Sequence, residues 1–564
     1  MAKGTRERLL SGGEILVDTL LAHGASHVFC VPGESFLPVL DALYDAPLTL
    51  TVCRQEGGAA MMAEAFGKLT GEPGICFVTR APGATNASAG VHIAQQDSTP
   101  MILFIGQVAR GTQEREAFQE IDYRRMYGPL AKWVAEIDDP ARIPEFVTRG
   151  FHTATSGRPG PVVLALPEDV LSATARLKPV DPYRRAEAHP GQGDMSRLKD
   201  LLAAARKPFV LVGGGGWSEA ACADLRRFAE TWRLPVGVSF RCQSYFDNDH
   251  PNYAGDVGIG VNPKLWQRIQ GADVLLVLGA RLGEMTTGGY RLLDVPKPRM
   301  TLIHVFPGAE EIGRVYQPAL GINAAMGPMA RALAGLEPPK KPGWAEATAR
   351  ARDDYLQWTE PPRIPGDVQL GEIMDWLRTR LPADAILTNG AGNYSAWPNR
   401  FYRYRQFRTL LGPTSGSMGY GVPAAIAAKR LYPERSVIAF AGDGCFLVTG
   451  QEFATACQYG LAIVVVVVNN AMYGTIRMHQ ERAYPGRVSG TALENPDFAA
   501  LARAFGGHGE LVVRTAEFAP AFERAIASRL PALIELRIDP EAISPNTTLS
   551  EIRAKAIAVK NKIT

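Results

Sequence analysis

Two short apolar runs that each end in polar residues constrain the fold of this chain most. The first, Val437–Ala441, leads into the glycine-flanked Asp443, and the second, Ile463–Val468, leads into Asn469 and Asn470. Runs that are apolar on both faces suit strands of a parallel sheet covered by helices, and the segment between them has helical composition. We therefore expect a strand–helix–strand unit that brings Asp443 and Asn470 to one sheet edge, where open α/β sheets bind ligands.

The polar residues at these two strand ends suit a metal and a phosphate. A carboxylate and an amide oxygen are hard ligands for Mg²⁺, which is commonly completed by water and by the phosphates of a substrate or cofactor. Gly444 lets the backbone approach a phosphate closely, and the start of the following helix favours an anion. For an isolated Gly-Asp-Gly, a tight turn before an Asn-rich loop is the structural alternative.

The rest of the chain divides into three parts of similar character. The 564 residues suit about three or four domains. Polar, proline-containing stretches at 172–193 and 336–366 predict linkers, the second with a short helix inside. The expected boundaries are 1–175, 190–340 and 365–545, followed by a C-terminal tail, 546–564, that has the composition of a basic amphipathic helix.

Each part alternates short apolar runs with helical stretches. The alternation predicts the α/β class, with three domains that each hold a mainly parallel sheet flanked by helices. The runs expected to form strands are 27–31, 49–53, 74–78, 101–105 and 161–166 in the first part, 208–212, 234–238, 274–278 and 301–305 in the second, and 385–387, 437–441, 463–468 and 532–536 in the third.

Composition excludes several other classes of protein. A hydrophobic content of 46% with 21% charged residues is typical of soluble globular proteins, and a net charge of +3 predicts neither a nucleic-acid nor a membrane partner. Seven cysteines without a CxxC pair indicate reduced thiols, as in a cytoplasmic protein. The first residues lack the apolar core of a signal peptide, and the longest apolar run is too short to span a bilayer.

The Gly-Asp-Gly and Asn-Asn pattern resembles the cofactor motif of thiamine diphosphate (ThDP)-dependent enzymes. The resemblance implies that Mg²⁺ is held by Asp443, Asn470 and the backbone carbonyl of Met472. Three further loops resemble those that surround ThDP: Ala81–Asn86, Asn389–Tyr394 and Gly416–Pro423. The cofactor-binding residues that the resemblance implies are Glu56, Pro82, Asn86, Gly392, Asn393, Tyr394, Gly416, Met418, Gly442, Asp443, Gly444, Cys445, Asn470, Tyr473 and Gly474.

Two of these side chains have specific expected roles. Met418 would be the apolar wedge that holds ThDP bent, although core packing alone also explains a methionine there. Cys445 stands where a serine is common, so we expect its backbone N–H rather than its thiol to contact a phosphate.

Glu56 is the expected catalytic carboxyl group. ThDP chemistry requires a carboxyl group hydrogen-bonded to the aminopyrimidine ring, and burial that raises its pKa helps it to carry the proton. Glu56 follows an expected strand in the sequence RQEGGAAMM, which resembles the glutamate signature of the family. A carboxylate that merely begins a helix is the structural alternative.

Within this family the chain is most similar to acetolactate (acetohydroxyacid) synthases. Their GQVPR and AFQE elements resemble residues 106–110 and 117–120, which implies that Phe118 and Gln119 lie over the thiazolium as catalytic residues. Related decarboxylases carry a histidine pair in this region to protonate the intermediate. Residues 106–132 contain no histidine, which favours carboligation over simple decarboxylation.

Two positions depart from the synthase pattern. Met285 stands where the family has an arginine for the carboxylate of the second oxo acid, and His479 replaces a tryptophan that selects the acceptor. A methionine cannot pair with a carboxylate, so an aldehyde or ketone acceptor becomes an alternative. His479 could supply part of the missing charge as a catalytic residue, and a surface-loop histidine is the plainer interpretation.

The resemblance implies a ThDP- and Mg²⁺-dependent decarboxylating carboligase, a transferase that acts on pyruvate or a similar 2-oxo acid. The alternatives are a 2-oxo acid decarboxylase, an aldehyde lyase or carboligase with a non-carboxylate acceptor, a flavin-dependent oxidase and a non-catalytic scaffold. A Rossmann dehydrogenase is excluded, because no GxGxxG with a following acid occurs. The family architecture implies a homodimer or homotetramer in which Glu56 of one subunit serves ThDP held by another.

Binding of FAD by the central part is left open. Gly213–Gly216 follows an expected strand but lacks the GxGxxG spacing. Flavin-binding relatives carry an acid after a later strand, where this chain has His304–Gly308 and no acid.

Overall fold

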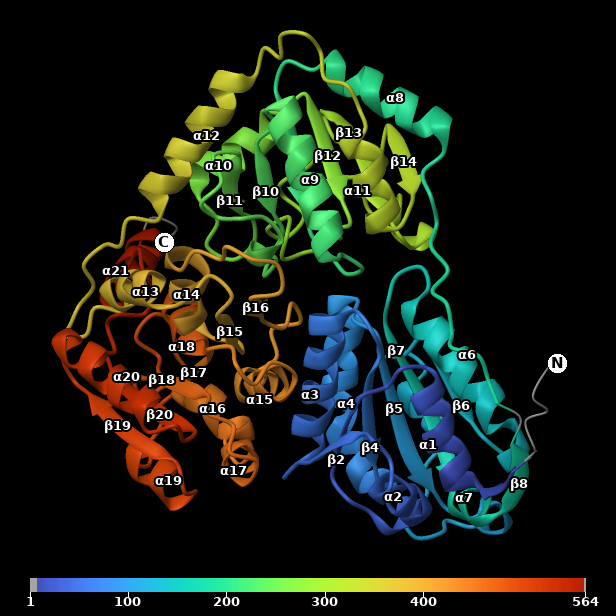
Figure 1. Ribbon diagram of the computed structural model, residues 1–564. Coiled ribbons are helices and arrows are strands. Elements are labelled where there is room, and N and C mark those ends of the chain that lie inside the picture. Colours follow the sequence, from blue (N-terminus) through green and yellow to red (C-terminus); the bar gives the residue numbers. More distant parts are fainter. Residues whose placement is uncertain (1–7, 178, 562–564) are drawn as a thin grey trace. The chain divides into compact units, whose positions relative to one another are not determined.

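The computed structural model describes residues 8–177 and 179–561. The chain divides between Glu187 and Ala188 into two compact units (Figure 1). The first unit contains one six-stranded parallel sheet and a two-stranded antiparallel sheet, and the second contains two six-stranded parallel sheets. This architecture confirms the expected fold class. In the described part of the chain, no helix has the length and apolar character needed to cross a membrane.

The sheet of the first unit has the strand order β3-β2-β4-β5-β7-β6. Its central strands β5 and β7 are buried along their whole length, as expected for a sheet covered on both faces. Helix α3 packs on α4, whereas α1 packs on α2 and α6, and Figure 1 shows these two groups on opposite sides of the sheet. The elements of this unit are β1 (Arg8–Ser11), α1 (Gly12–Ala22), β2 (His27–Cys30), α2 (Leu37–Tyr44), β3 (Thr49–Val52), α3 (Glu56–Thr70), β4 (Gly74–Val78), α4 (Ala81–Asp97), β5 (Met101–Gln107), α5 (Tyr123–Tyr127), β6 (Trp133–Glu136), α6 (Ile143–Thr155), β7 (Pro161–Pro167), α7 (Glu168–Ser172) and β8 (Thr174–Leu177).

The central sheet belongs to the second unit and has the order β11-β10-β9-β12-β13-β14. Its elements are α8 (Gln192–Ala203), β9 (Pro208–Val212), α9 (Glu219–Trp232), β10 (Val236–Val238), β11 (Tyr253–Asp256), α10 (Pro263–Gln270), β12 (Val274–Leu278), β13 (Thr301–Phe306), β14 (Leu320–Asn323), α11 (Met326–Ala334) and α12 (Ala345–Trp358).

The third sheet has the order β16-β15-β17-β18-β20-β19, so β15, β17 and β18 are direct neighbours. Gly442 at the end of β17 pairs with Val468 near the end of β18, which brings Asp443 and Asn469 to the same sheet edge. The elements are α13 (Leu370–Arg380), β15 (Ile386–Asn389), α14 (Ala396–Phe401), β16 (Leu410–Leu411), α15 (Gly421–Leu431), β17 (Val437–Gly442), α16 (Asp443–Thr449), α17 (Glu452–Gln458), β18 (Val464–Asn469), α18 (Gly474–Ala483), α19 (Phe498–Ala504), β19 (His508–Val512), α20 (Phe518–Ala527), β20 (Ala532–Arg537) and α21 (Leu549–Lys560).

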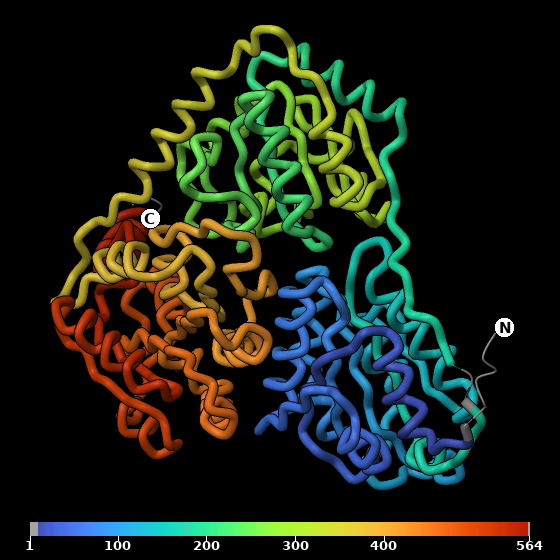
Figure 2. Tube along the Cα trace, viewed as in Figure 1, coloured from blue at the N-terminus to red at the C-terminus, as the bar shows by residue number. Residues whose placement is uncertain are grey.

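The stretches expected to be linkers contain ordered elements. The first stretch, 172–193, contains β8, which pairs with β1, and Tyr183, which packs against the core of the first unit. The second contains α12, the helix expected there. The tail forms α21, which packs against α18 and can be followed in Figure 2. Residues 562–564 of the tail lie outside the described residues, as do residues 1–7 of the first stretch, for which no signal peptide is expected. The three domain boundaries stay predictions.

Candidate active site

The polar cluster at the carboxyl edge of the third sheet centres on Asp443, the first residue of α16. Its side chain is only 3% exposed, and burial raises its pKa. One carboxylate oxygen, Oδ1, accepts the backbone N–H of Gly444 at 2.9 Å. The other, Oδ2, accepts the amide Nδ2 of Asn495, also at 2.9 Å. These two donors hold the buried carboxylate in one orientation.

Asn495 also connects Asp443 to the end of β18. The same Nδ2 donates to Oδ1 of Asn469 at 2.9 Å, and Asn469 Nδ2 donates to Oε1 of Glu535 on the neighbouring strand β20 at 2.8 Å. The buried Oδ1 of Asn495 has no hydrogen-bond partner among the described residues. Asn495 was not predicted from the sequence, because it lies outside every motif and only the tertiary fold brings it to Asp443.

The other two expected metal ligands lie in the segment that follows β18. Asn470 is half-buried, and its Nδ2 lies 3.1 Å from where a Cβ on Gly474 would be. Met472 forms an isolated antiparallel bridge with Ala492. The two hydrogen bonds of this bridge use the carbonyls of Ala471 and Thr491, each at 2.9 Å, and so do not occupy the carbonyl of Met472.

A carboxylate, an amide and a backbone carbonyl therefore gather at one strand edge. Such a hard oxygen donor set fits Mg²⁺, which keeps water and phosphate in its remaining positions. No group of three or more His, Cys, Asp or Glu side chains able to hold a metal occurs in the described ranges, and this donor set contains only one such side chain.

The two glycines beside Asp443 are fixed by tyrosine rings. A Cβ on Gly444 would lie 2.6 Å from the ring of Tyr473, and a Cβ on Gly442 would lie 2.9 Å from the ring of Tyr394. Only glycine fits at either position without moving a ring. The bare backbone at the start of α16, with its N–H groups, is the kind of surface that a phosphate can approach.

The loop after β15 is supported by the buried side chains of Tyr394 and Cys445. The hydroxyl of Tyr394 accepts the N–H of Gly390 at 3.0 Å and lies 3.2 Å from Sγ of Cys445. Burial raises the pKa of both side chains, so the phenol and the thiol are neutral. Tyr394 is 7% exposed and Cys445 is 4% exposed, which makes them supports of the loop. The expectation that the backbone of Cys445, not its thiol, contacts a phosphate stays a prediction.

Asn393 holds the same loop to other elements. Its Nδ2 donates to the carbonyl of Ile543 at 3.0 Å, and its Oδ1 accepts the hydroxyl of Thr475 on α18 at 2.9 Å. Gly392, just before it, has a φ of +149°, which favours glycine. The expected donation from Asn393 to a phosphate stays a prediction, since its amide is engaged within the protein.

The loop that follows β16 carries Gly416 and Met418. Gly416 is exposed with a φ of +70°, and its N–H donates to the carbonyl of Pro413 at 3.1 Å. Met418 is half-buried and packs against the core of the third sheet. A half-buried Met418 is compatible both with the expected wedge and with core packing alone.

In the first unit, Glu56 is the first residue of α3 and is half-buried. Its Oε2 accepts Nδ2 of Asn86 at 2.9 Å. Asn86 and Pro82 belong to the first turns of α4, so the two motifs that the sequence singled out separately meet at the starts of adjacent helices. The helix-starting role of Glu56 and a chemical role are compatible, because a carboxylate at a helix N-terminus keeps an oxygen available.

Phe118 and Gln119 lie in a loop of the first unit with unusual backbone geometry. Glu114, Glu116 and Gln119 have positive φ angles of 63°, 52° and 65°. The carboxylate of Glu120 accepts the N–H groups of Glu114 and Ala117, and these bonds lower its pKa. The carbonyl of Gln119 accepts the N–H of Ala81 at 3.1 Å, which ties the loop to α4. Phe118 is 72% exposed, an unusual state for a large apolar side chain.

The two residues that differ from the acetolactate synthase pattern are exposed. Met285 is 36% exposed, in the segment after β12, and His479 is exposed on α18. Near Met285, the Arg281 guanidinium pairs with the buried Glu311, with 3.4 Å between Nε and Oε2. Arg281 therefore already has a carboxylate partner within the protein.

At the carboxyl edge of the central sheet, side chains of the protein itself contact the glycine-rich loop after β9. Trp217 Nε1 donates to the carbonyl of Gly213 at 2.9 Å, and the Tyr245 hydroxyl donates to that of Gly214 at 2.8 Å. A Cβ on Gly214 would lie 1.8 Å from the carbonyl oxygen of Gly279, so the two loops at this edge are in direct contact.

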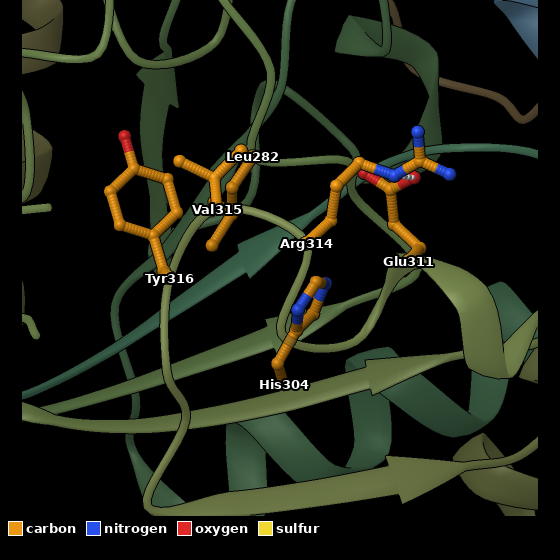
Figure 3. A pocket seen from close by; sticks show the side chains of 6 residues that line it. All are labelled: Leu282, His304, Glu311, Arg314, Val315 and Tyr316. Carbon is orange, nitrogen blue, oxygen red and sulfur yellow. Dashed lines mark ion pairs between the residues drawn. The ribbon is translucent and has the colours of Figure 1, made fainter. Parts of the chain in front are cut away.

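The nearby cavity is also small. Figure 3 shows the Arg314 side chain meeting Glu311, with the ring of His304 rising from β13. Its lining residues leave room for about one water molecule. His304 is buried, its Nε2 lies 3.1 Å from the carbonyl of Ala280, and burial lowers its pKa. This cavity is too small for the adenosine part of a flavin.

Comparison with protein families gives three matches along the chain. Residues 10–126 match "Thiamine pyrophosphate enzyme, N-terminal TPP binding domain", residues 195–333 match the central domain of the same enzymes, and residues 390–536 match the C-terminal TPP binding domain. Thiamine pyrophosphate is the same compound as thiamine diphosphate. The first match includes Glu56 and Asn86, and the third includes Asp443, Asn470 and Asn495.

Curated relatives are similar over nearly the whole chain. It is 30% identical to the acetolactate synthase isozyme 2 large subunit of Escherichia coli, over 94% of this chain and 96% of that protein. It is 33% identical to the acetolactate synthase large subunit of Corynebacterium glutamicum, over 92% and 84%, and 32% identical to that of Parasynechococcus marenigrum, over 94% and 88%. The chain therefore belongs to the family of thiamine pyrophosphate-dependent enzymes.

Proposed function

We propose that this protein is an acetolactate-synthase-type carboligase that decarboxylates pyruvate or a similar 2-oxo acid and transfers the remaining group to an acceptor carbonyl. The observation that carries the proposal is the likeness to acetolactate synthases over more than nine-tenths of the chain, together with intact Glu56, Asp443 and Asn470. The absence of histidine from residues 106–132 supports carboligation over simple decarboxylation.

The residues divide the work between the two units. When bound, ThDP supplies the electron sink for loss of CO₂. Asp443, Asn470 and the Met472 carbonyl would hold Mg²⁺, and the N–H groups at the start of α16 would face the diphosphate. Glu56, oriented by Asn86, would hold and move a proton at its carboxylate oxygens. The exposed Phe118 would cover the reacting centre and exclude water.

The protein would work as a homodimer or homotetramer in the cytoplasm, with Glu56 and Asp443 of different subunits in one active site. Glu56 and Asn86 lie at the surface of the first unit, and Leu447 and Val448 of α16 are 44% and 48% exposed. Exposed apolar residues next to a predicted site are the kind that a second subunit covers.

A second candidate is a carboligase whose acceptor has no carboxylate, such as an aldehyde or ketone. The specific observation is that position 285 holds an uncharged methionine, while Arg281, four residues before it, is paired with Glu311 at 3.4 Å. A methionine offers that carboxylate no compensation for its desolvation.

The decisive experiment is incubation with pyruvate, ThDP and Mg²⁺ while CO₂, acetolactate and acetaldehyde are measured. Acetolactate with CO₂ is the expected result. Acetaldehyde as the sole organic product would overturn the carboligase proposal in favour of a decarboxylase. Adding benzaldehyde or acetone as a competing acceptor separates the two candidates, because a mixed ketol at the expense of acetolactate favours the second.

Flavin provides an independent check of the central domain. We expect the purified protein to be colourless, without the absorbance near 450 nm of a bound flavin, because its own side chains occupy the edge of the central sheet. Stoichiometric flavin released on denaturation would contradict this.

A further inference from the structure

Arg241 is an unusual residue of the central domain. It follows β10, is 7% exposed, and has a φ of +62°, a left-handed conformation that is costly for a residue with a Cβ. Its guanidinium lies 5.0 Å from the centre of the Phe240 ring. A buried cation with a strained backbone persists only where the surrounding structure holds it, and such residues gather at functional sites.

The guanidinium reaches into the third domain and contacts two loops. Nη1 donates to the carbonyl of Pro413 and Nη2 donates to the carbonyl of Gly390, each at 2.7 Å. Gly390 begins the loop after β15 that leads to Gly392 and Asn393. Pro413 begins the loop after β16, and its carbonyl also accepts the N–H of Gly416. One planar side chain thus fixes the spacing of two loops that the sequence assigns to the cofactor.

Hydrogen bonds extend from this contact to the third cofactor loop. The N–H of Gly390 donates to the Tyr394 hydroxyl, which lies 3.2 Å from Sγ of Cys445, the residue after Gly-Asp-Gly. The N–H of Gly419, next to Met418, donates to the same sulfur at 3.2 Å. The loops after β15, β16 and β17 are therefore parts of one buried network, and Arg241 is its member from the central domain.

We propose that Arg241 is a positioning residue that sets the spacing between the diphosphate loop at Gly390 and the Met418 loop at Pro413, and so prepares the third domain for ThDP. This inference rests on the proposed function, because it concerns the cofactor of that same site. Arginine suits the task, since its rigid fork directs two N–H groups at two carbonyls at once. Without it, both buried carbonyls lose a charged donor, and the loops relax to satisfy them.

The test compares ThDP binding, in the presence of Mg²⁺, by the wild-type protein and by Arg241→Ala and Arg241→Lys. We expect Arg241→Ala to raise the Kd of ThDP by about tenfold or more, the effect of losing hydrogen bonds to a charged group. Arg241→Lys should also weaken binding, because a single amine cannot span both carbonyls. At saturating ThDP, kcat should fall less than the Kd rises. Guanidinium or methylguanidine at millimolar concentration should partly restore the affinity of Arg241→Ala.

Arg408→Ala is the matched control. Arg408 also has a positive φ, of 61°, and also joins the two domains, since its Nη2 donates to the carbonyl of Trp217 at 3.3 Å, but this contact involves no cofactor loop. Its Kd for ThDP should stay within about twofold of the wild type, a change below 1 kcal/mol. If Arg241→Ala does not fold, Arg241→Lys, which keeps the buried charge, carries the same test.

The outcomes separate this inference from the proposed function. A wild-type protein that binds no ThDP overturns the proposed function and this inference with it. A wild type that binds ThDP, with both Arg241 variants equally tight, overturns only the inference. An equal loss of affinity in Arg408→Ala also overturns it, because the effect would then belong to the domain contact in general.

Discussion

The carboxylate of Glu56 begins α3 and accepts one hydrogen bond from Asn86, which leaves its other oxygen, Oε1, available to a ligand. Glu56→Gln keeps the size of the side chain and its acceptor for Asn86, but it can no longer accept and release a proton. We expect turnover to fall by about 100-fold or more, the usual contribution of a general acid–base, while the circular dichroism spectrum and melting temperature stay unchanged. Near-normal turnover of this variant would contradict the assignment of Glu56 as a catalytic residue.

Asn495 contacts Asp443, the carboxylate proposed to hold Mg²⁺. It gives one hydrogen bond to Asp443 and one to Asn469, each at 2.9 Å. Partners that orient a metal ligand typically change metal affinity by roughly 10- to 100-fold. We therefore expect Asn495→Ala to raise the Mg²⁺ concentration for half-maximal activity by that factor, with kcat recovering at saturating Mg²⁺.

A suitable control for Asn495 is Asn546→Ala, which removes an exposed hydrogen bond to Arg400 and should leave the Mg²⁺ dependence unchanged. If Asn495→Ala has the same Mg²⁺ requirement as the wild type, then Asn495 does not orient the metal ligand.

At the residue scale, the sequence indicated the residues proposed to act on the cofactor, but not the residues that hold those side chains and loops in place. Glu56 and Asn86 each stand in a recognisable motif, and the structure brings them together. Asn495 and Arg241 stand in none, because a single side chain that supports a loop carries no spacing rule. Tyr394 lies between these cases, since its position was predicted but its role beneath the loop depends on packing against Cys445.

At the scale of elements, α18 is held against the C-terminal helix α21 by a buried carboxylate. Glu481 is 1% exposed, and its oxygens accept Nε and Nη2 of Arg553 at 2.8 and 2.7 Å and pair with Arg477 on its own helix. These hydrogen bonds, above all those from Arg553, lower the pKa of Glu481 to about 2. Because α18 begins directly after the cofactor motif, the pair connects the tail to the site.

The depressed pKa sets the direction of a pH effect on stability. The ionised Glu481 stabilises the folded state above its unfolded pKa of 4.5, and this contribution is lost as the pH falls towards about 2. We expect Glu481→Gln to lower the melting temperature at pH 7, by an amount equivalent to about 1–3 kcal/mol. The difference from the wild type should shrink below pH 4.5. The exposed Glu372→Gln should show no such difference, and a gap between wild type and Glu481→Gln that does not change with pH would contradict the assignment.

The strands that were not predicted from the sequence all lie at the edge of a sheet. β6, β11, β14, β16 and β19 are edge strands of the six-stranded sheets, and β1 and β8 are the two edges of the two-stranded sheet, whereas the central strands were predicted almost to the residue. A central strand is buried on both faces and needs a continuous apolar run, as in Val464–Asn469. An edge strand needs only one apolar face, so its short alternating pattern, as in Leu320–Asn323, cannot be distinguished from a loop.

At the scale of the whole molecule, the residues proposed for the two chemical tasks lie in separate units. Glu56, Asn86 and Phe118 lie in the unit that ends at Glu187, and Asp443, Asn470 and Met418 lie in the unit that follows. When the proton-carrying group and the metal ligands lie on different units, an active site can combine the first unit of one copy with the second unit of another copy. Activity then depends on assembly of the chain into an oligomer, and co-expression of two variants can test this dependence.

Co-expression of Glu56→Gln with Asp443→Ala tests this arrangement. Each variant alone should be inactive, because every site lacks one essential carboxylate. If each site takes Glu56 from one subunit and Asp443 from the other, a mixed dimer contains one site with both changes and one site with neither. Random mixing makes half of the dimers mixed, so we expect about a quarter of wild-type activity. Co-expression of Glu56→Gln with a chain that carries both changes should give none. Mixed dimers that form but show no activity would mean that each site is built within one chain.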